Sequence, residues 1–357
     1  MKILQLIDTL EPGGAERMAV NISNLLAENK FEVLLCAARA KGAFANQVNS
    51  LVKVECLHKR HVLDIRAFCK LYSIIKKNKI QIIHAHSSSV IWATLLKLIR
   101  PNVKVIWHDH YGFSENLKDK DRPIIRYFSF LFFGIIAVNE KLYQWSLKNC
   151  KVRKDKITLL KNFPHTTHAI KKTDSSIIKI VVLANLRPQK DHITFIQALA
   201  MIKETIAKKK VKIIFAGLFW EDEYYKSIRE LLNYNDLVDS VEFLGSVNDV
   251  MSLLLTCDIG VLSSKSEGLP VGLLEYGVAG LPVIVTNVGQ CAEVVHYGKC
   301  GIVVPPSAPQ EMAKALLDLI KNPQKRVDLG VALKERIEKE YGAKNFLKAY
   351  QQLIANV

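Results

Sequence analysis

The chain has 357 residues, long for one domain and sufficient for two, and 49% of them are hydrophobic, so two sizeable cores can form. Its seven cysteines include no Cys-x-x-Cys pair, which argues against a disulfide scaffold and for reduced thiols in a reducing compartment. The net charge of +16 is uneven: residues 1–170 hold 27 Lys and Arg against 13 Asp and Glu, a balance of +14, whereas residues 171–357 hold 23 against 21, a balance of +2.

The basic first half suggests an anionic partner. No nucleic-acid-binding module is recognisable, so an anionic membrane surface or a lipid-phosphate substrate is favoured over nucleic acid, with a Lys-rich solubilising surface as the alternative. No apolar stretch reaches the roughly 18–20 residues that span a bilayer, and the first residues, which include Asp8, predict a strand rather than a signal peptide. We therefore expect a cytoplasmic protein that can associate peripherally with the inner face of the plasma membrane.

The first half of the chain alternates short apolar runs with helical patterns, which predicts βαβ units and a parallel sheet. The expected strands are Ile3–Ile7, Glu32–Ala37, Val52–Leu57, Ile80–His84, Val103–His108, Gly134–Val138 and Ile157–Leu160. The expected helices include Ala15–Glu28, Ala67–Asn78, Val90–Ile99 and Pro123–Phe132.

The same alternation begins again after a polar, basic linker, His165–Ser176. The expected strands there are Ile178–Ala184, Val211–Ala216, Val241–Leu244 and Cys257–Leu262, and the expected helices are Ile193–Lys208, Glu221–Asn233 and Val247–Cys257. This repetition implies two doubly wound α/β domains, and Lys344–Ala355 predicts a final amphipathic helix.

A glycine-rich loop, LEPGGAER at residues 10–17, follows the first expected strand and opens the first expected helix. Gly13 and Gly14 permit a close backbone approach to a ligand, and the helix start favours an anion. The loop lacks the Gly-x-Gly-x-x-Gly spacing, which speaks against a nicotinamide cofactor. A plain tight turn is the alternative interpretation.

Two pairs of histidines end neighbouring strands: His84 with His86, and His108 with His110. Ligands bind at the carboxyl ends of strands in open α/β sheets, so both pairs are expected to line the same site. A metal site is an alternative, but the His-x-His spacing lacks further convergent ligands. A purely structural role for these histidines is the other alternative.

Residues 122–133 are apolar and aromatic with basic residues at the start. This composition favours a core helix that leads into the next strand, and a membrane-interfacial face is the alternative. Further along, Arg187 and Lys190 stand three apart on a strand-to-helix turn, where two cations can bind a diphosphate through charge-assisted hydrogen bonds. A surface Arg–Lys pair is the plain alternative.

The most informative segment is SEGLPVGLLE, residues 266–275, directly after an apolar strand. A strand, a glycine turn and a helix start direct free N–H groups toward an anion. Glu275 lies too far into the helix to bind that anion, but it can accept hydrogen bonds from sugar hydroxyls. Because Glu275 has apolar neighbours, an unpaired charge there would be unfavourable, which argues against an ordinary solvated glutamate.

The pattern S-x-x-E-G-L-P-x-x-x-L-E-x-x-x-x-G-x-P-V-I that begins at Ser264 resembles the donor-site signature of retaining nucleotide-sugar glycosyltransferases of family 4, which have the GT-B fold. The resemblance covers essentially the whole chain and is sharp only at the donor motifs. It implies an α/β protein with two Rossmann-like doubly wound parallel-sheet domains that face each other across a cleft. The implied domains are an acceptor-side domain at 1–165, to which a C-terminal helix at 341–357 returns, and a donor-binding domain at 177–340.

The resemblance also implies roles for individual residues. Catalytic roles fall to Glu267, which would hold hydroxyls of the transferred sugar, and to His110, which would orient that sugar, with His108 as its rival. The implied substrate-binding residues are Gly13, Gly14, Arg187, Lys190, Gly268, Leu269, Pro270 and Glu275. The family wording Gly-Arg-Leu-x-x-x-Lys matches at Lys190, but Asn185 stands at the arginine position, so Arg187 is expected to substitute.

The predicted activity is retaining transfer of a sugar from a nucleotide-diphosphate donor, such as a UDP- or GDP-sugar, to a hydroxyl of a saccharide or lipid-linked saccharide acceptor. The expected setting is bacterial surface polysaccharide or lipid-linked glycan synthesis, with no metal, no cofactor and no nucleic acid. One rival is a sugar-nucleotide epimerase of the same fold, and another is a non-catalytic nucleotide-sugar-binding subunit. The nucleobase, sugar, acceptor, linkage and oligomeric state are not encoded in these motifs.

Overall fold

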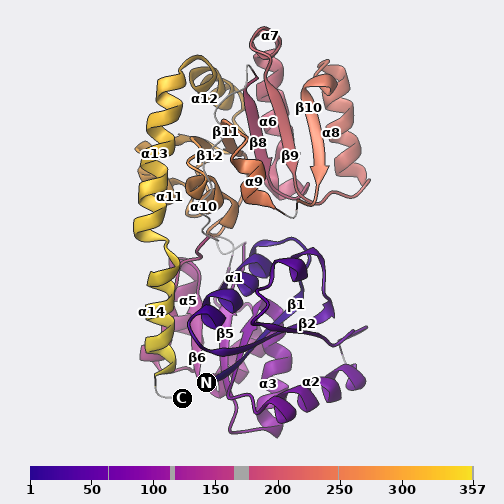
Figure 1. Cartoon of the computed structure of the whole chain (residues 1–357), viewed down its shortest axis with the longest axis vertical. Coiled ribbons are helices and arrows are strands. Elements are labelled where there is room, and N and C mark those ends of the chain that lie inside the picture. Colours follow the sequence, from indigo (N-terminus) through magenta and orange to yellow (C-terminus); the bar gives the residue numbers. More distant parts are fainter. Residues whose placement is uncertain (63, 113–116, 165–176, 248, 356–357) are drawn as a thin grey trace. The chain divides into compact units, whose positions relative to one another are not determined.

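The computed structural model describes residues 1–62, 64–112, 117–164, 177–247 and 249–355. The chain divides into two compact units: unit 1 comprises Met1–Phe163 with Ala343–Val357, and unit 2 comprises Pro164–Gly342 (Figure 1). The expected linker His165–Ser176 lies outside the described residues. All seven cysteines are free thiols, and five of them are buried.

Unit 1 is a seven-stranded parallel sheet in the order β3-β2-β1-β4-β5-β6-β7. Its strands are β1 Lys2–Thr9, β2 Glu32–Ala40, β3 Lys53–Cys56, β4 Ile82–His86, β5 Lys104–Asp109, β6 Gly134–Ala137 and β7 Ile157–Leu159. Its helices are α1 Gly14–Glu28, α2 Ile65–Asn78, α3 Val90–Ile99, α4 Pro123–Phe128, α5 Glu140–Asn149 and α14 Ala343–Ile354. The strands are near-continuous apolar runs because helices cover both faces of such a sheet.

Unit 2 is a six-stranded parallel sheet in the order β10-β9-β8-β11-β12-β13. Its strands are β8 Lys179–Leu183, β9 Lys212–Ala216, β10 Val241–Gly245, β11 Ile259–Leu262, β12 Val283–Thr286 and β13 Ile302–Val304. Its helices are α6 His192–Met201, α7 Lys203–Lys208, α8 Glu223–Tyr234, α9 Val250–Leu254, α10 Val271–Val278, α11 Cys291–Val294, α12 Pro309–Lys321 and α13 Pro323–Glu340. The single helix expected at Ile193–Lys208 is two helices that meet at Ile202.

The last helix returns to unit 1, where α14 lies on the sheet (Figure 1). Phe346, Tyr350, Leu353 and Ile354 form its buried face, the spacing of an amphipathic helix. The return begins at Ala343 rather than at Tyr341, because Tyr341 is 2% exposed and packs in the core of unit 2.

The aromatic segment that begins at Arg122 differs from the expectation of a core helix. Helix α4 buries none of its residues, and Ile124, Tyr127 and Phe130 are 55%, 65% and 57% exposed. Phe132, at 6% exposure, lies in the core of unit 1, and Ile125 and Leu131 are partly buried against it. The expectation was wrong for α4 because an apolar composition alone does not show which side of a short helix faces the sheet.

The net charge of the protein belongs to unit 1. Unit 1 contains 29 Lys and Arg against 13 Asp and Glu, a net charge of +16, while unit 2 contains 21 of each and has a net charge of zero. The asymmetry between the halves of the sequence therefore becomes sharper in the fold, because α14 adds Lys344 and Lys348 to the basic unit.

Candidate functional site

Both sheets reverse their strand order between two neighbouring strands, β1 and β4 in unit 1 and β8 and β11 in unit 2. The crevice outside the carboxyl ends of such a pair is the usual ligand site of open α/β sheets. In unit 2 the loop after β8 carries Lys190 and the loop after β11 carries Glu267. The sequence motifs of unit 2 therefore meet at its switch point.

Lys190 and Glu267 form an ion pair, with 2.5 Å between Nζ and Oε1. The Ser264 hydroxyl donates to the same Oε1 at 2.6 Å. Glu267 is 5% exposed, a burial that a carboxylate tolerates only with such partners. The sequence placed Lys190 and Glu267 in one site, but it did not predict that they contact each other or that Ser264 joins them.

Three further hydrogen bonds hold the two loops together. Gln189 Nε2 donates to the Ser266 carbonyl at 2.8 Å, the Lys265 N–H donates to the Gln189 carbonyl at 2.8 Å, and the Ser263 hydroxyl donates to the Lys190 carbonyl at 2.9 Å. The Lys190–Glu267 pair is therefore fixed by backbone contacts on both sides, as a site that acts without rearrangement requires.

Glu275 lies in the second turn of α10 and is 7% exposed. The next residue, Tyr276, anchors this helix across the switch point: its hydroxyl accepts from the Leu183 N–H at 2.6 Å and lies 3.2 Å from the carbonyls of Val181 and Val261. Its ring packs against Gly260, where any Cβ would approach the ring to 2.9 Å. The sequence analysis missed Tyr276, although a glycine inside a buried strand signals such a close approach.

The Gly268–Pro270 turn is supported from the loop after β12. The Gln290 N–H donates to the Gly268 carbonyl at 3.0 Å. Gly289 has φ +51°, and a Cβ there would lie 2.2 Å from the Glu267 carbonyl oxygen, so only glycine fits. Leu269 is buried, and Pro270 immediately precedes α10. The backbone that presents Glu267 to the helix start is therefore fixed.

Asn185 and Arg187 are placed differently. Asn185 Oδ1 accepts from the Leu218 N–H at 2.9 Å, so this side chain joins the loops after β8 and β9. Arg187 is exposed, with its guanidinium 5.8 Å from the centre of the Trp220 ring. Arg187 is therefore the more accessible of the two to a ligand, and it has the charge that Asn185 lacks.

In unit 1, Gly13 and Gly14 connect β1 to α1. Gly14 is the first residue of α1 and is exposed, and a Cβ added to it would meet nothing within 4 Å. A Cβ on Gly13 would meet only the Glu16 side chain, at 2.3 Å from Oε2. The fold of unit 1 itself therefore gives no steric reason for glycine at position 14.

The four histidines form one array on β4 and β5. His84, His86 and His108 are fully buried, whereas His110 is half-buried. Neighbouring rings stack with centroids 4.0 to 5.4 Å apart. His84 Nε2 lies 3.1 Å from His108 Nδ1, and His86 Nδ1 lies 3.0 Å from His110 Nε2.

This array is electrically neutral. Burial lowers the pKa of His110 to about 3, and burial followed by the charge of His110 lowers that of His84 to about 3. Burial and the neighbouring rings also hold the pKa values of His86 and His108 well below their usual range. Nitrogens of His84, His86 and His108 lie within 4.8 Å of one another, close enough to hold a metal ion. The same rings hydrogen-bond in pairs, His84 with His108 and His86 with His110.

The end of β5 is held by a buried ion pair. Arg122 Nη1 lies 2.5 Å from the Asp109 carboxylate, and its guanidinium packs over the rings of Tyr111, Trp107 and Trp145 at 4.4, 5.6 and 5.3 Å. Burial raises the pKa of Asp109, and Arg122 acts against that shift. Because Asp109 and Tyr111 flank His110, this cluster fixes the backbone that presents the histidine.

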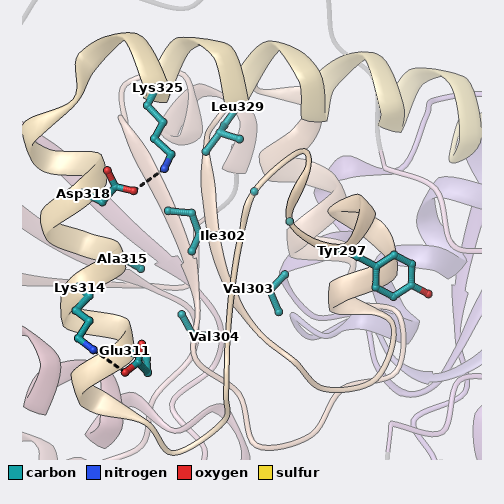
Figure 2. A pocket seen from close by; sticks show the side chains of 12 residues that line it. Tyr297, Ile302, Val303, Val304, Glu311, Lys314, Ala315, Asp318, Lys325 and Leu329 are labelled. Atoms are coloured by element: carbon teal, nitrogen blue, oxygen red, sulfur yellow. Dashed lines mark hydrogen bonds and ion pairs between the residues drawn. The ribbon is translucent and has the colours of Figure 1, made fainter.

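A surface hollow in unit 2 lies away from these residues, between β13, α12 and α13 (Figure 2). Its charged side chains pair with one another: Lys325 with Asp318 at 2.6 Å and Lys314 with Glu311 at 2.9 Å. It contains none of the residues that the sequence selected. The motif residues of unit 2 are instead gathered at the carboxyl edge of the sheet.

Two doubly wound parallel-sheet units of this kind define the GT-B class of glycosyltransferases. Residues 12–167 match the family Glycosyltransferase Family 4, and residues 166–336 match the family Glycosyl transferases group 1. The two matches together span residues 12–336, so the chain is a family 4-like glycosyltransferase of the GT-B type.

Relatives and solved structures agree with this assignment. An uncharacterised glycosyltransferase of Haemophilus influenzae is 24% identical over 96% of each chain. The UDP-Gal:α-D-GlcNAc-diphosphoundecaprenol α-1,3-galactosyltransferase of Escherichia coli is 24% identical over 77% of this chain and 76% of that enzyme. HepE of Anabaena, solved in complex with UDP-glucose, aligns over the whole of both chains with a TM-score of 0.84 and 20% identity, a likeness of fold.

Among the described residues, the helices are all too short or too polar to cross a bilayer.

Proposed function

We propose that this glycosyltransferase moves a sugar from a nucleotide-diphosphate donor, such as a UDP- or GDP-sugar, to an acceptor hydroxyl with retention of anomeric configuration. The observation that carries the proposal is that Lys190 and Ser264 both donate hydrogen bonds to the same carboxylate oxygen, Glu267 Oε1. This sharing leaves Oε2 to accept hydrogen bonds from hydroxyls of the transferred sugar. Lys190 uses one of its three N–H donors on Glu267 and offers the others to the diphosphate.

The remaining roles follow from position. Glu275 would accept hydrogen bonds from the ribose hydroxyls, and the Gly268–Pro270 turn at the start of α10 would lie beside the donor. Arg187 and Lys190 would stabilise the negative charge that grows on the diphosphate as the glycosidic bond breaks. Gly13 and Gly14 would allow a close approach of ligand to the start of α1, and His110 would orient the sugar.

The proposed chemistry takes place on one face of the sugar. The anomeric carbon loses its bond to the diphosphate oxygen and gains a bond to the acceptor oxygen, while the acceptor proton passes to the leaving phosphate. No protein base is needed, because the leaving group itself takes the proton. No cofactor or metal enters this scheme.

For the acceptor, we propose a saccharide or lipid-linked saccharide of bacterial surface polysaccharide or lipid-linked glycan synthesis. The similarity to an enzyme named for a diphosphoundecaprenol acceptor supports this class. Unit 1, with its net charge of +16, would attract a phosphate-bearing lipid.

The donor is tested first. Thermal shifts would be measured with UDP, GDP, ADP, CMP and their sugar conjugates on the wild type and on Glu275→Ala. A nucleotide at about 100 times its Kd adds about 2.7 kcal/mol of stability, so one nucleotide family should stabilise the wild type, with a smaller shift for the variant. No shift with any nucleotide would count against the donor site.

Turnover is tested with the nucleotide sugar that binds. With donor alone, a transferase hydrolyses the sugar slowly at most, whereas an epimerase would convert it. With a lipid-linked saccharide added, NMR of the product should show the anomeric configuration of the donor, and inversion would overturn the retaining mechanism. Tight nucleotide binding without turnover would favour a non-catalytic binding subunit.

We also propose that α4 contacts an anionic membrane surface. Ile124 and Tyr127 on α4 and Phe130 just after it are exposed, and Lys151 Nζ lies 5.4 Å from the Tyr127 ring centre. An apolar face flanked by basic residues is the composition of an interfacial helix.

Vesicle flotation tests this surface. Binding to phosphatidylglycerol vesicles should exceed binding to phosphatidylcholine vesicles, and it should weaken with salt. The double variant Tyr127→Ser/Phe130→Ser should reduce it, whereas Tyr297→Ser, at a similarly exposed tyrosine of unit 2, should not. Equal binding to both lipids, or by all variants, would contradict the proposal.

A further inference from the structure

A row of polar side chains crosses the buried face of unit 1 from α14 to the end of β5. Its members are Tyr350 on α14, Gln5 on β1, His86 on β4 and His110 after β5. Gln5, His86 and Tyr350 are all fully buried. Two hydrogen bonds link Gln5, His86 and His110, and hydrogen bonds are strong in such a buried environment.

The first link joins Gln5 to His86. Gln5 Oε1 lies 2.8 Å from His86 Nε2. The other end of the amide, Gln5 Nε2, has no hydrogen-bond partner among the described residues, and neither has the buried Tyr350 hydroxyl. The amide oxygen is therefore the end of Gln5 that faces His86.

The second link joins His86 to His110, at 3.0 Å between Nδ1 and Nε2. Both rings are neutral because burial lowers their pKa values, so each ring has one N–H and one lone pair. An amide oxygen only accepts, so the His86 proton is on Nε2. His86 Nδ1 must then accept, and the His110 proton is on Nε2.

We propose that Gln5 and His86 are positioning residues that fix His110 as the Nε2–H tautomer, so that its Nδ1 accepts a hydrogen bond from a hydroxyl of the transferred sugar. This inference rests on the proposed role of His110. The ring nitrogen that carries the proton is set by the partner of the other nitrogen. His110 is the member of the array that reaches the surface, while the rest of the row lies in the core.

The row also gives α14 a part in the site. Tyr350 stacks on His84 with ring centroids 5.3 Å apart, so α14 covers the buried side of the array. If the Gln5 amide turned over, each proton of the row would change sides, and His110 would present an N–H in place of a lone pair. A free hydroxyl of the sugar can donate to a His110 lone pair or accept from a His110 N–H. A hydroxyl that already donates its proton to another group can only accept, so it would bind only the N–H form.

Imidazole nitrogen NMR tests the tautomer directly. Two-bond ¹H–¹⁵N correlation on the full chain with ¹⁵N-histidine, assigned with His110→Gln, should show His110 protonated on Nε2 and unprotonated on Nδ1. The Nδ1–H form in the wild type would overturn the proposal. The tautomer is measured on the wild type, so the result does not depend on enzymatic activity.

Variants then test the row. Gln5→Met keeps the side-chain volume but removes the acceptor, so His110 should become a mixture of tautomers and kcat should fall about tenfold, the effect of one lost hydrogen bond. Nucleotide affinity, which belongs to unit 2, should stay unchanged. Tyr341→Phe, at a buried tyrosine of unit 2, is the control and should leave the His110 tautomer as it is.

The outcomes separate this inference from the proposed function. One outcome is that the wild type is active and Gln5→Met changes the His110 tautomer but leaves kcat unchanged. That result would show that His110 Nδ1 does not contact the sugar. An unchanged tautomer in Gln5→Met would overturn the positioning role. Absence of transferase activity from a wild type with the expected tautomer would instead refute the function.

Discussion

The two units use the same strand order, with unit 1 adding one strand at an edge, yet the chemistry at their switch points differs. In unit 2 the polar groups come from loops and a helix beyond the strand ends, and they are charged: Lys190, Glu267 and Glu275. In unit 1 they come largely from the strands themselves, and they are neutral imidazoles inside a domain of net charge +16. Equal topology therefore does not imply equal site chemistry, because the sheet fixes only where side chains gather.

The largest expected difference between the units is their response to acid. Four histidines of unit 1 have folded-state pKa values depressed below the ordinary value of about 6.5. Among the histidines in the described part of unit 2, only His192 has a depressed pKa, which burial and then the charge of Lys190 lower to about 4. Below pH 6.5 the unfolded chain binds more protons, so stability falls as the pH drops. Each such histidine lowers the free energy of unfolding by up to about 1.4 kcal/mol for each pH unit below its unfolded pKa.

Hydrogen exchange resolved by segment would measure this effect. Between pH 7 and pH 5.5 the strands of unit 1 should lose far more protection than those of unit 2, after correction for the intrinsic exchange rates. His296→Asn, at an exposed histidine of unit 2, serves as the control and should leave the profile unchanged. Equal losses in both units would show that the array is already protonated at neutral pH or is not buried.

Glu267→Gln should have the largest effect on turnover. The amide leaves Lys190 without its charged partner and presents a weaker acceptor to the sugar, so kcat should fall about 100-fold, close to 2.7 kcal/mol. Glu230→Gln, at an exposed carboxylate of the same unit, should be neutral. In a double-mutant cycle with Lys190→Ala the losses should be clearly non-additive, and additive losses would mean that the pair does not act as one group.

Glu275→Ala should act mainly on binding. Loss of hydrogen bonds to a charged group should weaken donor affinity by roughly 1–3 kcal/mol, with a smaller change in kcat at saturating donor. Isothermal titration with the nucleotide that stabilises the wild type would measure it, again with Glu230→Ala as the control. An unchanged nucleotide affinity would show that Glu275 does not contact the ribose.

Gly14→Ala should have the smallest effect on the fold and a selective effect on activity. Because a Cβ at position 14 meets nothing within 4 Å, the melting temperature should hardly change, while a ligand that approaches the backbone would be displaced and kcat/KM should fall about tenfold, or about 1.4 kcal/mol. Gly289→Ala is the contrast, since its φ of +51° and its 2.2 Å contact should lower stability by about 1–3 kcal/mol. Unaltered activity in Gly14→Ala would show that no ligand comes close to this loop.

The same contrast explains what could be predicted from the sequence. The donor-side motif is contiguous, from Ser264 to Glu275, so its strand, turn and helix could be predicted together. The pairing of Glu267 with Lys190 crosses 77 positions and follows only from the strand order. The unit 1 site is harder still, because Gln5, His86 and Tyr350 belong to three elements at opposite ends of the chain.

Burial explains other differences between expectation and structure. The short run IIHAH that forms β4 predicts a strand, but periodicity does not show that its histidines are covered by α14. Helix α4 was assigned to the core from its composition, whereas it buries none of its residues fully and exposes Ile124 and Tyr127. In both places the burial of an element depends on contacts distant in sequence.

Because α14 follows unit 2 along the chain, unit 1 is discontinuous in sequence, and unit 2 is inserted between its two segments. During synthesis the β-strands of unit 1 emerge first, but the helix that covers His84 and places Tyr350 beside Gln5 emerges after all of unit 2. Domains generally fold as the chain emerges, so unit 2 should be complete while the histidine face of unit 1 is still uncovered. In this protein unit 2 is therefore expected to be complete before unit 1, although most of unit 1 is translated first.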